Sequence, residues 1–334
     1  MKRSWLLIFG FILLCTLTIG CGGGGGGSDS SSRVFRSTKL TSGTTENLND
    51  IWYNYNQFCV VGNNGTILSS TTSVADQPNG WTLNTSPTDA DLYDITGKGD
   101  TYYAVGVDSA TNKNKILKFN GTIWSLLKEE PTTSGTFYGI DCDDDQVDQL
   151  VVVGSEGWGK FIGGGWNFYP LVDIELSKLK INALTEDYVY FSAIGKKEVG
   201  IITCNRFGHV NDFQERDNPC NNVKLNDFIS EDSLNEDVYV GDQGTILLYN
   251  KTTNQWRQVP SGTTENLNGV AYMYFNSSKL ELLIVGDNGT IVFYNGASCS
   301  KVNSGTSANI NAVCAEGLRY YAVGDGGTIL QVTW

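Results

Sequence analysis

The densest group of carboxylates in the sequence is the run DCDDDQVD at positions 141–148, which holds five aspartates. Asp141, Asp143 and Asp145 alternate as the first ligands of an EF-hand loop do, and Ca²⁺ prefers such oxygen ligands. Gln146, however, stands where an EF-hand loop has its glycine. The run therefore predicts a solvated turn between two strands, with calcium binding by Asp141, Asp143 and Asp145 as the alternative.

His209 is the only histidine in the sequence. A Ser-His-Asp triad or a histidine-rich metal site would therefore depend on this residue alone. Its neighbours, NRFGHVND at 205–212, are typical of the tip of a hairpin, where a histidine is exposed to solvent. The sequence therefore predicts no catalytic site, no resident metal and no cofactor.

Cysteines are the next residues that could do chemistry. Two of them, Cys15 and Cys21, belong to the amino-terminal segment, and an even number remains: Cys59, Cys142, Cys204, Cys220, Cys299 and Cys314. An even number suits an exported protein in an oxidising compartment, although spacing alone does not give the connectivity. Cys204 and Cys220 flank the longest hairpin, so we predict a disulfide between them. The pairing of the others stays open.

The amino terminus has the pattern of an export signal. Lys2 and Arg3 precede an apolar run, positions 5–14, that is too short to span a bilayer unaided. The sequence TIGC at 18–21 then resembles the lipobox of bacterial lipoproteins, in which the cysteine becomes the lipidated first residue. This resemblance implies a signal peptide over residues 1–20 and a lipid on Cys21.

Residues 21–33 are rich in Gly and Ser, which predicts a flexible tether between the lipid and a globular body at 34–334. Gly22 stands where an Asp would retain a lipoprotein at the inner membrane of Gram-negative bacteria. We therefore expect a lipid-anchored protein of the cell envelope, at the outer membrane, which faces the periplasm or the surface. Without Lys2 and Arg3, 21 of the 23 basic residues stand against 36 acidic ones, which excludes nucleic acid as a partner.

One hairpin recurs along the rest of the chain. VGNNGTI, VGDQGTI, VGDNGTI and VGDGGTI begin at Val61, Val240, Val285 and Val323, and weaker copies contain Gly106, Gly154 and Gly195. Each copy has a strand rich in β-formers, a turn of Asp, Asn and Gly, and a return strand. Successive anchor glycines lie 38 to 48 residues apart, the period of one four-stranded propeller blade. The sequence therefore predicts an all-β, seven-bladed β-propeller.

A second repeat leads into each innermost strand. SGTTENLN at 42–49 recurs letter for letter at 261–268. The chain reaches Trp334 after only three strands of the seventh blade, while Val34–Leu40 precedes the first blade. We therefore expect Val34–Leu40 to supply the missing outer strand and to close the ring without an open edge.

Together these motifs resemble those of the photosystem II assembly and stability factor family of seven-bladed propellers, over roughly residues 34–334. The resemblance implies a chaperone-like scaffold that binds other proteins. Family members carry an arginine-rich patch, whereas the arginines here are scattered: Arg33, Arg36, Arg206, Arg216, Arg257 and Arg319. The same scatter argues against a sialidase, which needs three convergent arginines.

Two blades depart from the tight turn. VDSATNKNK at 107–115 and GKKEVG at 195–200 replace it and introduce Lys113, Lys115, Lys196 and Lys197 on one face of an acidic molecule. These lysines could form a basic patch for an acidic partner, and loop drift is the alternative.

The function that follows from the sequence is a monomeric, non-enzymatic scaffold that binds an unidentified protein. The alternative is a carbohydrate-binding or glycosidase-like propeller with its site at the central channel.

Overall fold

The computed structural model describes residues 33–54, 56–142, 149–162, 164–171, 175–184, 189–196, 201–205, 213–216, 219–220, 223–231, 233–273 and 280–334. The expected signal peptide, Cys21 and the tether up to residue 32 lie outside the described residues. So do Asp143, Asp145, Lys197 and His209, and the side chains of Lys196 and Cys204. Phe35–Trp334 forms one compact unit. In the part of the chain that the structure describes, no helix has the length and apolar character needed to cross a bilayer.

The described strands form seven four-stranded antiparallel sheets, each built from consecutive strands except the last, which also contains β1. Their bounds, sheet by sheet from the innermost strand outward, are β2 (Leu48–Asn54), β3 (Gln57–Gly62), β4 (Ile67–Thr71), β5 (Thr82–Leu83); β6 (Asp91–Lys98), β7 (Thr101–Asp108), β8 (Lys113–Phe119), β9 (Trp124–Pro131); β10 (Phe137–Cys142), β11 (Leu150–Gly154), β12 (Gly157–Ile162), β13 (Gly165–Pro170); β14 (Glu175–Leu184), β15 (Val189–Lys196), β16 (Ile201–Asn205), β17 (Phe213–Arg216); β18 (Leu225–Ile229), β19 (Glu236–Gly241), β20 (Thr245–Asn250), β21 (Gln255–Gln258); β22 (Leu267–Tyr272), β23 (Leu282–Gly286), β24 (Ile291–Tyr294), β25 (Cys299–Lys301); and β26 (Ile310–Glu316), β27 (Arg319–Gly324), β28 (Thr328–Thr333), β1 (Arg36–Leu40).

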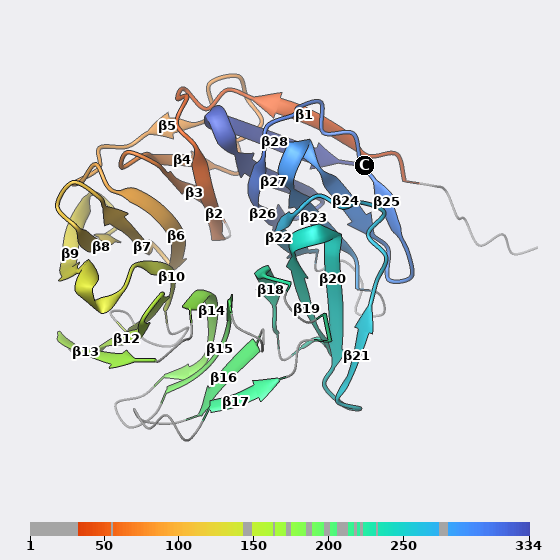
Figure 1. Ribbon diagram of the computed structural model, residues 1–334. Helices are drawn as coiled ribbons and strands as arrows, with labels where there is room; N and C mark the ends of the chain where they lie inside the picture. Colours follow the sequence, from red (N-terminus) through yellow and green to blue (C-terminus); the bar gives the residue numbers. More distant parts are fainter. Residues whose placement is uncertain are drawn as a thin grey trace, which may run out of the picture. The chain divides into compact units, whose positions relative to one another are not determined.

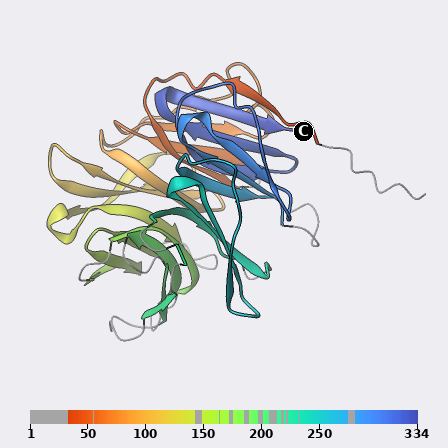
Figure 2. The ribbon, with the colours of Figure 1, turned by 45° about the vertical axis from the view of Figure 1, so that its right-hand side comes forward.

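The innermost strands lie side by side in the order β2, β6, β10, β14, β18, β22 and β26, and β26 also contacts β2. Figures 1 and 2 show the sheets following one another around a common centre, with the first sheet next to the last. Hydrophobic residues of adjacent sheets pack between them. Phe58 of β3 and Tyr321 of β27, for example, have ring centroids 4.5 Å apart.

β1 occupies the place that the sequence predicts for the outer strand of the last sheet. It pairs antiparallel with β28 over five residues, from Arg36 opposite Thr333 to Leu40 opposite Ile329. Leu40 is buried together with Ile329 in the cluster that packs the first sheet against the last. The two ends of this compact unit are therefore joined by main-chain hydrogen bonds.

The anchor glycine of each repeat is explained by a close backbone approach. A Cβ at Gly286 would lie 2.0 Å from the carbonyl oxygen of Asn266, at the start of the innermost strand of the same sheet. A Cβ at any of the other six anchor glycines would lie 1.7 to 2.2 Å from an equivalent carbonyl oxygen. The turn that follows needs positive φ, which Asn288 (52°) and Gly289 (67°) supply.

The Asp of the repeated turn and an Asn of the innermost strand hold neighbouring sheets together. Asp325 Oδ1 accepts a hydrogen bond from Asn311 Nδ2 at 3.0 Å, and the same amide donates to the carbonyl of Leu48 in the next sheet at 2.9 Å. Equivalent side chains at three other junctions donate across to the next sheet: Asn49, Asn226 and Asn268. We call these four residues the asparagine latch. The repeated motif thus joins sheets.

We predict that Asn311→Ala lowers the free energy of unfolding by about 1–2 kcal/mol, because it leaves the carbonyl of Leu48 without its side-chain donor. Chemical denaturation of the full chain measures this loss. Asn79→Ala, at an exposed turn residue, is the matched control and should change stability by less than about 0.5 kcal/mol. Equal stabilities of the two variants would contradict a joining role for the latch.

Candidate functional site

The seven innermost strands surround one cavity of about 920 Å³, to which every one of them contributes side chains. Along β2 the cavity extends from Asp50 to Asn54. Leu48, at the start of β2, pairs with Gly62 next to the tight turn, so the cavity extends away from the tight turns. The cavity therefore lies toward the face of the ring opposite to the tight turns and the SGTT loops.

The cavity is lined by five acidic and three basic side chains, which are Asp50, Asp94, Asp141, Asp227, Glu231, Lys98, Lys178 and Lys180. Aromatic residues also line it, namely Trp52, Tyr53, Phe228 and Tyr272. A formal excess of two negative charges therefore lies among partly apolar walls. Such a mixture of apolar surface and a few fixed polar groups is typical of a binding site.

Lys178 crosses the base of this cavity. Its Nζ lies 2.5 Å from Asp94 Oδ1 and 3.1 Å from Asp50 Oδ2, so β14 is ion-paired with β6 and β2. β14 and β2 lie on opposite sides of the centre of the ring (Figure 1). The Lys178 side chain is 24% exposed, and those of Asp50 and Asp94 are 10% and 6% exposed. The ion pairs thus lie among buried carboxylates, at the end of the cavity nearer the tight turns.

Each buried aspartate also accepts a hydrogen bond from a backbone N–H of the next innermost strand. Asp50 Oδ2 accepts from Ile95 at 3.1 Å and Asp94 Oδ2 from Ile140 at 2.7 Å. Asp227 Oδ2 likewise accepts from Val270 at 2.8 Å. The three aspartates follow a register shift in their own strands, between Leu48 and Asp50 and at the equivalent places. These bulges turn the side chain toward the neighbouring strand.

The protonation of this group is set by burial and by Lys178. Burial raises the pKa of Asp94 well above its ordinary value, against the opposing charge of Lys178 and with added repulsion from Asp50. Burial lowers the pKa of Lys178, but the charges of Asp50, Asp94 and Asp227 outweigh this effect, so its pKa is raised and it stays cationic. Burial raises the pKa of Asp227 to about 6, although Lys178 opposes the shift.

Asp141 is not in a solvated turn, so the prediction for the acidic run is wrong at this residue; positions 143–148 lie outside the described residues. The residue belongs to β10, where it is 8% exposed. Asp141 Oδ2 accepts from the Ile181 N–H at 2.7 Å, and its Oδ1 accepts from Thr96 Oγ1 at 2.8 Å. β10 extends into the acidic run, and Asp141, the first carboxylate of that run, lines the cavity. Among the described residues no group of three His, Cys, Asp or Glu side chains could hold a metal ion.

Two of the lysines predicted to form a basic patch, Lys113 and Lys115, do not line the cavity. Lys113 Nζ lies 2.8 Å from Glu129 Oε2, and Lys115 contacts Glu129 and lies 3.7 Å from Asp108. Lys115 is only 7% exposed. These two charges are therefore neutralised within the second sheet. The patch as a whole stays a prediction, because the side chain of Lys196 and all of Lys197 lie outside the described residues.

The structure describes only some of the cysteines that the disulfide predictions concern. Cys220 is half-buried, but the side chain of its predicted partner, Cys204, is not among those described, so the disulfide stays a prediction. Cys59, Cys299 and Cys314 form no disulfide. Cys314 lines the cavity.

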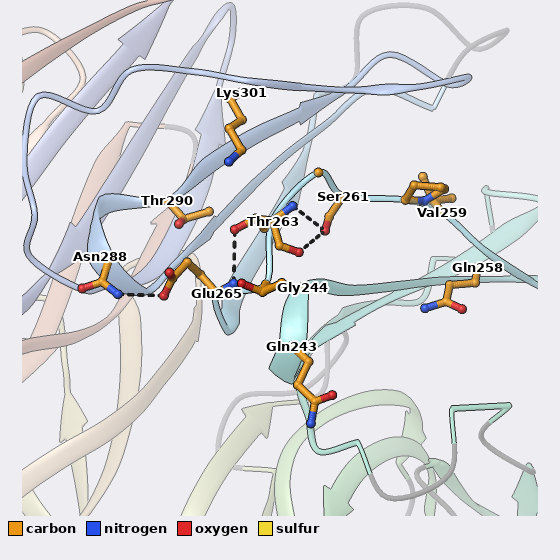
Figure 3. Close-up of a pocket in the computed structure, with 13 residues that line it drawn as sticks. Gln243, Gly244, Gln258, Val259, Ser261, Thr263, Glu265, Asn288, Thr290 and Lys301 are labelled. Atoms are coloured by element: carbon orange, nitrogen blue, oxygen red, sulfur yellow. Dashed lines mark hydrogen bonds between the residues drawn. The ribbon is translucent and has the colours of Figure 1, made fainter.

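A second hollow, of about 680 Å³, lies beside the SGTT loop of the sixth sheet (Figure 3). Its side chains bond one another: Ser261 Oγ donates to the Thr263 carbonyl at 3.2 Å, and Asn288 Nδ2 donates to Glu265 Oε2 at 2.7 Å. Figure 3 shows both contacts on the wall of the hollow. A similar hollow accompanies the first SGTT loop, at residues 39–45. The SGTT repeat therefore builds the junction between sheets, and the central cavity is the better site.

Comparison with solved structures identifies the architecture. A structure of YCF48, a photosystem II assembly factor, bound to a D1 peptide has a TM-score of 0.67 at 13% identity, covering 91% of this chain and 98% of that one. YCF48 from Cyanidioschyzon merolae gives 0.68 at 13% identity, with 89% and 98% covered. The fold is a β-propeller. Virginiamycin B lyase from Staphylococcus aureus, at 0.69 and 14% identity, covers 90% of this chain and 99% of its own.

No family model and no curated protein sequence matches the chain. At these identities the likeness to solved propellers establishes the fold alone. The solved propellers include an assembly factor and an enzyme, so the function has to be argued from the cavity.

We predict that Lys178→Met destabilises the full chain by about 2–4 kcal/mol at pH 7.5, because Asp50 and Asp94 are left buried without their cation. Burial already raises the pKa of Asp94 against the opposing charge of Lys178, and without that charge its folded-state pKa would lie still further above the unfolded value. The loss should therefore grow as pH rises and shrink toward pH 5. Denaturant midpoints across this range measure it. Lys39→Met, on the exposed side of β1, is the control. A loss independent of pH would contradict the assigned ion pairs.

Proposed function

We propose that the protein is a non-enzymatic binding protein: a seven-bladed propeller, closed by β1, that holds an extended polypeptide segment in its central cavity. The observation that carries this proposal is the cavity itself, because all seven innermost strands line it and it combines aromatic walls with an excess of carboxylates. Binding of a D1 peptide by a propeller of the same fold, YCF48, supports a polypeptide ligand.

Binding is favoured over catalysis by what the carboxylates already do. Asp50, Asp94, Asp141 and Asp227 each accept a backbone N–H from the neighbouring strand. A carboxylate fixed in this way holds its strand and has less freedom to act as a nucleophile or a general acid. The described residues also contain no imidazole that could work beside one of them.

The second candidate is a carbohydrate-binding or glycosidase-like site in the same cavity. It is favoured by Trp52 and Tyr272, whose rings line the cavity near carboxylates, as sugar sites require. A polypeptide accounts equally for the aromatic walls and better for the excess charge.

A tiled array of 15-residue peptides from envelope proteins, probed beside a glycan array with the full chain, tests the proposal. We expect retention on a subset of peptides and none on glycans. Ser230→Trp, which places a large ring at the edge of the cavity, should weaken peptide binding at least tenfold. Ser300→Trp, on the exposed outer strand β25, should change it less than twofold. Retention on glycans alone, lost in Ser230→Trp, would favour the second candidate and refute the first.

We also propose that the amino-terminal segment anchors the protein to the envelope through a lipid on Cys21, with the outer membrane as its site. The lipobox-like sequence and the Gly and Ser tether support this. Cys21→Ala should move the protein from the membrane fraction to the soluble fraction, because one lipidated terminus supplies the anchor. Mass spectrometry that finds an unmodified cysteine at the mature terminus would refute the anchor.

A further inference from the structure

Asp227 differs from Asp50 and Asp94 in forming no direct ion pair, although the charge of Lys178 acts on it at longer range. Asp50 and Asp94 share Lys178, whereas Asp227 forms no ion pair with the described residues. Its oxygens accept only two backbone N–H groups, from Val270 at 2.8 Å and from Phe228 at 2.9 Å. Amides orient a carboxylate but leave its charge in place, so this group can still bind a cation.

The surroundings of Asp227 suit the rest of a basic side chain. Phe228 and Ile229 follow it on β18, and Val270, Ala271 and Tyr272 of β22 line the same part of the cavity. An aliphatic stem can pack on such a wall while its charged end reaches a carboxylate. Phe228 and Tyr272 are aromatic residues of this lining, and aromatic rings attract cations over their faces.

We propose that the cavity is selective for a polypeptide segment that inserts a lysine or arginine side chain, whose cation pairs with Asp227. This proposal rests on the proposed function and names the feature of the polypeptide that the site recognises. An acidic side chain would meet the excess of carboxylates, and a neutral one would leave Asp227 without a directly paired cation. Complementary charge therefore fixes which residue of the segment enters the cavity.

The same pairing makes binding depend on pH. Across the cavity from Asp227 lie Asp50 on β2 and Asp94 and Lys98 on β6. Lys178 and Lys180 lie on the adjacent strand β14, Asp141 lies on β10, and Glu231 follows β18. Because burial raises the pKa of Asp227 to about 6, the group is mostly ionised at pH 7.5 and mostly protonated at pH 5. Selectivity for a basic side chain should therefore be strong at pH 7.5 and weak at pH 5.

The test compares two peptides that differ only in charge: acetyl-GGXGG-amide with X as lysine or as norleucine. Titration calorimetry of the full chain at pH 7.5 should give the lysine peptide a Kd about tenfold lower. In Asp227→Asn, whose amide oxygen can still accept from Val270, the two values should agree within about twofold. Asp100→Asn, an exposed carboxylate in the hairpin between β6 and β7, should keep the tenfold ratio.

The outcomes separate this proposal from the proposed function. Equal affinities in the unaltered protein, or a ratio that survives Asp227→Asn, would overturn the basic selectivity and leave peptide binding intact. Absence of binding by the lysine and norleucine peptides alike, together with no retention on the array of 15-residue peptides, would overturn the proposed function. Should Asp227→Asn fail to fold, the ratio for the unaltered protein at pH 5 and pH 7.5 decides the matter, because an unchanged ratio would overturn the assignment to Asp227.

Discussion

The innermost strand of each sheet is an edge strand. The N–H groups on the side that faces the centre of the ring have no further strand to pair with. A buried N–H without an acceptor costs free energy comparable to a lost hydrogen bond. At four of the junctions an aspartate of one sheet accepts an N–H of the next innermost strand, as Asp50 does from Ile95. The carboxylates at the centre of the ring are therefore first a means of joining sheets, and the acidity of the cavity follows from this joining.

The distribution of these residues around the ring determines what the cavity can bind. At the position after the bulge the sheets carry, in order, Asp50, Asp94, Gly139, Lys178, Asp227, Gly269 and Ala312. The one lysine forms direct ion pairs with Asp50 and Asp94, whereas it acts on Asp227 only at longer range. A site with a defined charge thus arises from residues that satisfy the backbone, and one side of the cavity stays apolar. Under the proposed function, structure and recognition would share the same atoms, so a substitution here would change both.

The fold could be predicted because its signals are local. The Val-Gly anchor and the turn of Asp, Asn and Gly each reflect contacts within one hairpin, such as the missing space for a Cβ at Gly286. The prediction that Val34–Leu40 forms the outer strand of the last sheet agrees with β1. It could be made because the edge of β28 would otherwise stay unpaired. The reason for the Asp in the turn was not predicted, since its partner Asn311 also reaches another sheet.

The cavity was harder to predict, because its members come from all the sheets and converge only in space. Asp50, Asp94 and Asp227 each follow a Leu by two positions, and Lys178 follows Leu176 in the same way. Alignment of the repeats on that Leu would have placed these four charged residues in one column. A single charged residue in one strand gives no sign that the others lie near it. Asp141 was assigned to a turn because four more aspartates follow it, although the strand FYGIDC before them runs through it.

β1 and β28 pair residues that stand at opposite ends of the compact unit, Arg36 with Thr333. Such a pairing encloses nearly the whole unit in one loop, and the entropy of closing it has to be met before any of its hydrogen bonds form. During synthesis β1 is made first and its partner last. Until β28 has been synthesised, β1 has no partner strand, whereas the six other sheets can form from neighbouring segments. The polar side chains on its outer positions, Arg36, Thr38 and Lys39, then protect a segment that would otherwise invite aggregation.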